Sequence, residues 1–117
     1  MKLRNPYKKT DYTQLDILEK YLIDNGIEYT RVDEYRHNKD LGYISERHQI
    51  MVPDNSAEYY KWDAICHYGS YGSEEGLLEI AGQLVDEAID GDSVKGWLTA
   101  EQVIERIKKY GNEHKRS

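Results

Sequence analysis

The chain contains no phenylalanine, one cysteine and two prolines among its 117 residues. The single cysteine, Cys66, excludes an intramolecular disulfide and a cysteine-rich zinc site. No apolar run approaches the roughly 20 residues that span a bilayer, and residues 1–10 lack the apolar stretch of a signal peptide. We therefore expect a cytoplasmic protein that does not enter the membrane. A chain of this length supports one hydrophobic core and hence one domain.

The aromatic residues that are present, 11 tyrosines and two tryptophans, all carry a polar group. Such residues are enriched in interfaces and in ligand pockets. Charge is distributed unevenly: residues 11–105 carry a net charge of −14, whereas residues 1–10 and 106–117 together carry +8. A nucleic-acid-binding protein would gather basic groups on one face, so we expect no direct binding to nucleic acid. The composition favours a protein partner with a basic surface, and a solubilising acidic surface is the alternative.

Hydrophobic periodicity predicts a single α+β domain over residues 11–111, between a basic extended arm at 1–10 and a frayed basic tail at 112–117. The first helix is expected at 12–25, because its leucines share one face and Asn25-Gly26 is a C-terminal stop. Alternating segments separated by a loop at 36–45 and by turn residues then predict an antiparallel meander of three strands. These strands are expected at 27–35, 47–52 and 59–67.

The segment after Ser73 shows the clearest helical spacing in the chain, and Ser73 can cap a helix that begins there. The apolar positions of this predicted second helix are Leu77, Ile80, Ala81, Leu84, Val85 and Ala88. Residues 94–98 suit a fourth strand or an extended connection, and the capping box at 99–102 begins a last helix that Gly111 ends. The expected fold is a three- or four-stranded antiparallel sheet with about three helices packed mainly on one face.

A glycine-punctuated turn joins the third predicted strand to this second helix. Glycines let backbone N–H groups crowd together, and a helix N-terminus favours an anion. The predicted ligand-binding residues are Arg47, His67, Gly69, Ser70, Tyr71, Gly72 and Ser73. Glu74 and Glu75 would repel an anion at the same place, so a purely structural turn is the alternative.

Other chemistry has weaker support in the sequence. Cys66 and His67 are adjacent in a predicted strand, so their side chains should point to opposite faces and not form a catalytic pair. A small enzyme that uses His67, Asp63 and a tyrosine remains an alternative. Asp90, Asp92 and Glu101 have the spacing of a calcium loop, but Val94 and Lys95 stand where that loop needs a ligand and a glycine. We expect no metal and no cofactor.

Several segments together carry a resemblance to a known group of proteins. They are Arg47-His48-Gln49-Ile50, Trp62-Asp63-Ala64-Ile65-Cys66-His67, Gly69-Ser70-Tyr71-Gly72, Glu75-Gly76-Leu77-Leu78-Glu79-Ile80 and Asp90-Gly91-Asp92-Ser93-Val94-Lys95-Gly96-Trp97-Leu98-Thr99-Ala100. In these segments the chain resembles small uncharacterised proteins of bacteriophages and prophages of Gram-positive bacteria, for which no activity is assigned. The resemblance implies an accessory protein in the cytoplasm of a bacterial host. Small phage proteins of this kind often bind a host component, as inhibitors of CRISPR nucleases and sponges for signalling nucleotides do.

The leading interpretation is therefore a phage-encoded binding protein that inhibits a host defence factor such as a CRISPR nuclease. Its acidic, tyrosine-rich surface would occupy a basic site on that protein. The predicted partner-binding residues are Asp33, Glu34, Tyr35, Tyr59, Tyr60, Glu74 and Glu75. The alternative from a different class is a sponge for a nucleotide signal, which binds an anion at the Gly69–Ser73 turn, as a monomer or across a homodimer interface.

Overall fold

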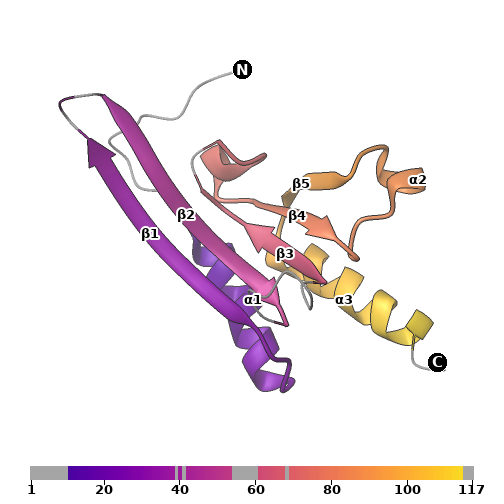
Figure 1. The fold of residues 1–117 in the computed structure, drawn as a ribbon. Coiled ribbons are helices and arrows are strands. Elements are labelled where there is room, and N and C mark those ends of the chain that lie inside the picture. Colours follow the sequence, from indigo (N-terminus) through magenta and orange to yellow (C-terminus); the bar gives the residue numbers. More distant parts are fainter. Residues whose placement is uncertain (1–10, 39, 41, 54–60, 68, 115–117) are drawn as a thin grey trace.

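The computed structural model describes residues 11–38, 40, 42–53, 61–67 and 69–114 as an α+β fold (Figure 1). The expected fold class is confirmed, but the antiparallel sheet has five strands and not three or four. In chain order the elements are α1 (Thr13–Asp24), β1 (Thr30–Asn38), β2 (Tyr43–Val52), β3 (Trp62–Ile65), η1 (Ser73–Glu75), β4 (Leu78–Gly82), α2 (Glu87–Asp90), β5 (Val94–Leu98) and α3 (Ala100–His114).

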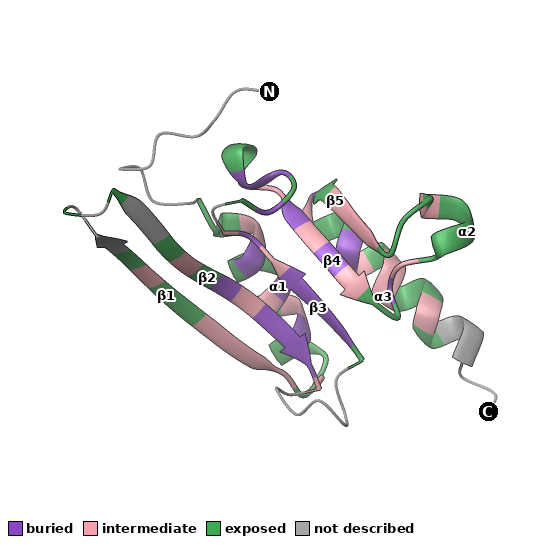
Figure 2. Cartoon of the chain, turned by 45° about the horizontal axis from the view of Figure 1, so that its top comes forward, coloured by how far each residue is buried: buried purple, intermediate pink, exposed green. Residues whose placement is uncertain are grey.

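The five strands follow one another in space as they do in the sequence, in the order β1-β2-β3-β4-β5, and each pairs antiparallel with the next. Helices α1 and α3 lie side by side against one face of the sheet (Figure 1). The β1–β2 hairpin extends well beyond the helices (Figure 1), and in its outer half the residues whose burial is described are exposed or intermediate (Figure 2). The sheet is thus covered on one face, and only along part of its length.

The core lies between this face of the sheet and the two helices. Three leucines of α1 at a spacing of three and four residues, Leu15, Leu18 and Leu22, are fully buried. Trp62 and Ala64 of β3, and Cys66 just after the strand, are buried in the core, in the alternation that the sequence predicts. The core is completed by Ile50, Val52, Leu78, Ile80, Leu84, Leu98, Ala100 and Val103.

Helix α3 begins with the predicted capping box. The Gln102 backbone N–H donates to Thr99 Oγ1 at 3.2 Å, and the Thr99 N–H donates to Gln102 Oε1 at 2.9 Å. The helix does not end at Gly111 but continues to His114, because a glycine inside a helix lowers its stability without breaking it. Neither α3 nor the other described helices combine the length and apolarity needed to cross a membrane.

The predicted second helix is wrong. Its first residues form η1, a single 3₁₀ turn that follows Gly72 and has no side-chain cap from Ser73. Its centre forms β4, in which Leu78 and Ile80 are buried while Glu79 and Ala81 lie on the other face. Of the six apolar positions expected on one helix face, only Ile80 and Leu84 are buried, whereas Leu77, Ala81 and Val85 are half-buried and Ala88 is exposed.

Strand boundaries also differ from the prediction. The expected loop at 36–45 is mostly strand, because β1 runs to Asn38 and β2 starts at Tyr43. The pairing of these two strands supplies hydrogen bonds that the polar sequence alone does not indicate. Strand β3 is shorter than expected, and residues 59 and 60 lie outside the described residues.

Candidate functional site

The Gly69–Ser73 turn follows β3 and is held by its own hydrogen bonds. The Ser70 backbone N–H and hydroxyl both donate to the His67 carbonyl oxygen, at 2.9 and 2.8 Å, and the His67 N–H donates to Ser70 Oγ at 3.0 Å. The Ser73 N–H donates to the Ser70 carbonyl oxygen at 3.1 Å. Both serines are buried. The Ser70 hydroxyl and the N–H groups of both serines therefore stabilise the turn.

The turn packs directly against β5. Gly72 has a φ of 98°, and a Cβ at this position would lie 3.1 Å from both Cα and N of Trp97. A Cβ on Gly96 would clash with the Cβ of Tyr71. The Trp97 N–H also donates to the Tyr71 carbonyl oxygen at 3.3 Å. Both close approaches need glycine, so Gly72 and Gly96 together allow the turn to sit on the strand.

Trp97 is the one described residue other than glycine that has a positive φ, at 62°. It lies where the pairing of β4 and β5 shifts register. A left-handed backbone at a bulky residue costs about 1–3 kcal/mol. Burial of the Trp97 side chain does not offset this strain energy, because the side chain is 47% exposed. The side chain of Tyr71 beside it is 56% exposed. Tyr71 and Trp97 form what we call the aromatic patch.

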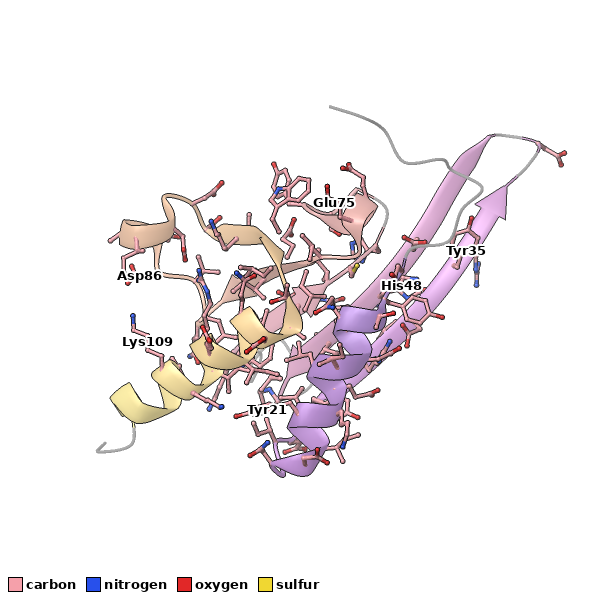
Figure 3. All side chains as sticks on the ribbon, turned by 180° about the vertical axis from the view of Figure 1, so that it is seen from behind. Tyr21, Tyr35, His48, Glu75, Asp86 and Lys109 are labelled. Atoms are coloured by element: carbon pink, nitrogen blue, oxygen red, sulfur yellow. The ribbon has the colours of Figure 1, made fainter. Side chains whose placement is uncertain are left out.

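Three carboxylates belong to the segments next to the aromatic patch. Glu74 and Glu75, in η1, are exposed. Glu79 of β4 accepts a hydrogen bond from the Tyr71 N–H at 3.0 Å. Figure 3 shows Glu75 at the opposite end of the molecule from Tyr21. We call Glu74, Glu75 and Glu79 the acidic rim. An aromatic surface bordered by negative charge is suited to a partner with cationic side chains.

The predicted anion site shares this turn, but several of its donors have partners within the protein. The Tyr71 N–H donates to the Glu79 carboxylate, and the Ser73 N–H donates to the Ser70 carbonyl oxygen within the turn. His67 Nδ1 accepts from the His48 backbone N–H at 3.3 Å, and burial lowers the pKa of His67 below its ordinary value of 6.5, so the ring is neutral at pH 7. Arg47 Nε donates to Gln49 Oε1 at 2.8 Å. Anion binding stays a prediction, and it would have to displace the Glu79 carboxylate.

The residues considered for catalysis lie apart. Cys66 and His67 follow the end of β3; Cys66 is buried in the core, and its Sγ donates to the Asp11 carbonyl oxygen at 3.4 Å, whereas His67 is half-buried. Asp63 is buried and accepts a hydrogen bond from Gln49 Nε2 at 2.7 Å. Asp63 lies within β3, whereas His67 lies two residues beyond the end of this strand. Asp63 is bonded to Gln49, and His67 to the His48 backbone N–H, so among the described contacts neither is the partner of the other.

The sequence interpretation missed a buried polar network on the helix side of β1 and β2. His48 Nδ1 lies 2.8 Å from Asp33 Oδ1, and His48 Nε2 lies 3.9 Å from Glu46 Oε2. The Tyr12 ring stacks on the His48 ring, with centroids 4.7 Å apart. Arg31 Nε lies 2.8 Å from Asp33 Oδ2. His48 has no signature in the sequence except its place in the alternation of β2, so only the paired strands show the network.

This network changes the interpretation of the predicted partner-binding residues. Burial disfavours the charged form of Asp33, but hydrogen bonds from His48 and Arg31 outweigh this effect and lower its pKa. Asp33 therefore has a structural role. Glu34 lies on the opposite face of the strand and is exposed, and Tyr35 is half-buried. The Asp33 side chain is nevertheless 42% exposed, so partner binding at Asp33 and Glu34 stays a prediction, while Tyr59 and Tyr60 lie outside the described residues.

A hollow of about 570 Å³ lies between residues 83–90 and α3. One wall is fixed by Arg106, whose guanidinium donates to both carboxylate oxygens of Asp90 at 2.8 and 3.0 Å and to the Leu84 carbonyl oxygen at 3.0 Å. The Asp90 carboxylate, considered above for calcium, is thus bonded to a cation of the protein itself. Arg106 and Asp90 neutralise each other, and Asp86, Glu87 and Lys109 also line the hollow, so its lining carries a net charge of −1.

No family model, curated protein or solved structure matches this chain. The functional argument therefore depends on geometry and chemistry alone.

Proposed function

We propose that this protein acts by binding a partner protein through the aromatic patch and the acidic rim. The observation that carries the proposal is the exposed side chain of Trp97 on a strained left-handed backbone. Strain of this kind persists where function requires it, and tryptophan and tyrosine are the residues that most often dominate binding energy at interfaces.

The charge of the chain supports a basic partner. Residues 11–105 carry −14, and Glu74 and Glu75 extend that negative charge to the edge of the patch. A surface that presents carboxylates around aromatic rings competes well for a groove built to hold nucleic acid. We propose as the partner a host defence factor such as a CRISPR nuclease, with this protein as its phage-encoded inhibitor.

The experiment is differential capture from a lysate of the bacterial host, read by mass spectrometry. We expect that Tyr71→Ala combined with Trp97→Gly lowers capture of the specific partner by about tenfold or more. Glu74→Lys combined with Glu75→Lys should slow association, and rising salt should reduce the association rate of the unsubstituted protein. Asp92→Lys, at an exposed acid close to the other end of β5, is the matched control and should leave capture unchanged.

Equal capture by the patch variants and the control would refute the proposal. If association with the partner does not depend on salt, the aromatic patch stays the proposed contact, but the acidic rim does not steer association.

A further inference from the structure

Strand β1 forms one edge of the sheet, and its nine residues make it a long edge (Figure 1). It carries no proline and, in the part of the chain that the structure describes, its register with β2 is continuous. A long, regular edge strand is a template for pairing with another strand unless the protein blocks it.

One hydrogen bond on the far side of β2 determines which residues of β1 point their backbone groups out of the edge of the sheet. The Cys66 N–H donates to the His48 carbonyl oxygen at 3.0 Å, so the backbone groups of His48 point toward β3. Because these directions alternate along a strand, Arg47 and Gln49 bond to β1, and their register partners Glu34 and Val32 bond back to β2. The backbone groups of the odd-numbered residues, 31, 33, 35 and 37, therefore point out of the edge.

We propose that β1 pairs antiparallel with β1 of a second copy of this chain, around a two-fold axis at position 35. Outward-pointing residues must face one another, which restricts the axis to a residue position. With the axis at 35, Glu34 of each copy faces Arg36 of the other, twice in the dimer. This opposite pair is of the type in which the side chains approach most closely. Both side chains are exposed.

The neighbouring registers are disfavoured by charge. An axis at position 34 would place Glu34 against Glu34, and an axis at 36 would place Arg36 against Arg36. An axis at 33 would oppose two Asp33 residues. Like charges directly opposite one another destabilise a strand pair, so the arrangement of acids and bases in β1 favours the axis at 35 over the axes at 33, 34 and 36. The edge lies far from the aromatic patch, at the other end of the strand order.

Charge swapping tests this register, with oligomeric state measured by sedimentation velocity over a concentration series. We expect a dimer for the unsubstituted protein, and a dissociation constant raised about tenfold or more for Glu34→Arg and for Arg36→Glu alone. An equimolar mixture of the two variants should form a heterodimer, because each Arg then faces a Glu. The double variant E34R/R36E should regain the homodimer, and Glu74→Arg is the matched control that should stay dimeric.

Amide exchange provides a readout of the edge itself. The Asp33 and His37 N–H groups should exchange more slowly in the dimer than in Glu34→Arg, while those of Val32 and Glu34 change little. Far-UV circular dichroism confirms that each variant is folded. A monomer at every concentration, or singly substituted variants that dimerise as well as their mixture, would overturn the proposal. Neither outcome bears on capture through the aromatic patch, which Tyr71→Ala combined with Trp97→Gly tests separately.

Discussion

Asp90 shows how a single carboxylate ties the β4–β5 connection to α3. Its side chain is 5% exposed, and hydrogen bonds from Arg106 lower its pKa from 3.8 to about 2 despite burial. We expect Asp90→Asn to cost about 1–2 kcal/mol of unfolding free energy at pH 7, less than the full shift implies because Arg106 is partly exposed and water screens the pair. Urea unfolding of the variant and the parent protein measures the difference.

The pH dependence of this difference has a defined sign. A carboxylate whose pKa is lowered in the folded state contributes stability above its unfolded pKa, and loses it as pH falls through the folded value. The cost of Asp90→Asn should therefore be constant above about pH 4 and vanish near pH 2. Asp92→Asn, at an exposed acid two residues away, is the control and should show no such window. A cost that persists at pH 2 would assign the effect to packing.

For Trp97, unlike Asp90, we expect substitution to cost little stability. Trp97→Gly removes an exposed ring and places glycine, which tolerates a positive φ, at a strained position. We expect unfolding free energy to stay within about 0.5 kcal/mol of the parent or to rise by about 1 kcal/mol, because relief of backbone strain offsets the lost contacts. A thermal or urea melt checks this. A loss above about 2 kcal/mol would make Trp97 a structural anchor and weaken its role as a binding residue.

At the level of elements, the segment from Ser73 to Ala88 shows where sequence reasoning fails. Leu77, Ile80, Ala81 and Leu84 fit helical spacing, but Leu78 and Ile80 fit strand alternation equally well. Pairing with β3 and β5 selects the strand, and that pairing is invisible in a local pattern. The leucines of α1, the capping box of α3 and the alternation of β3 carry unambiguous local signals, and those predictions are confirmed.

The candidate site was only partly predictable for the same reason. The sequence identified the glycine turn, and Tyr71 within it, from residues that are neighbours in the chain. Trp97 reaches the turn only because β5 pairs with β4, so its contact with Tyr71 depends on packing between residues 26 positions apart. Its left-handed backbone could not be anticipated, because tryptophan gives no local preference for it.

Two glycines test the packing of β4 against β3. Gly82 and Gly91 both have positive φ, but a Cβ on Gly82 would lie 2.8 Å from Trp62 Cα and clash with the Lys61 carbonyl oxygen, whereas Gly91 faces open space. We expect Gly91→Ala to cost about 1 kcal/mol from backbone strain alone. Gly82→Ala should cost about 2 kcal/mol more, because the strand must also move. Equal costs in chemical denaturation would show that β3 and β4 are not this close.

At the scale of the whole molecule, the sheet has two unequal parts. Helices α1 and α3 cover one end, where Ile50, Ala64 and Ile80 are fully buried. The outer part of the β1–β2 hairpin extends past them, with Glu34, Arg36 and Ser45 exposed (Figure 2). Backbone hydrogen bonds that are not covered by packed apolar side chains break locally, because little buried surface is exposed when they open. The hairpin can therefore present its edge to a second copy while the covered end keeps the fold intact.

Native-state amide exchange should reveal this gradient, provided that it is measured in the Glu34→Arg variant, where pairing between copies is weakened. The N–H groups of position 34 and Arg36 bond to β2, so in a uniformly stable sheet they would exchange as slowly as those of Ala64 and Ala81. We expect their opening free energy to be lower by about 2 kcal/mol or more, because the outer hairpin opens without exposing the core. Denaturant should slightly affect exchange at Arg36 and strongly affect exchange at Ala64, since surface exposed on opening sets that dependence. Equal opening energies would mean that the hairpin unfolds only with the whole domain.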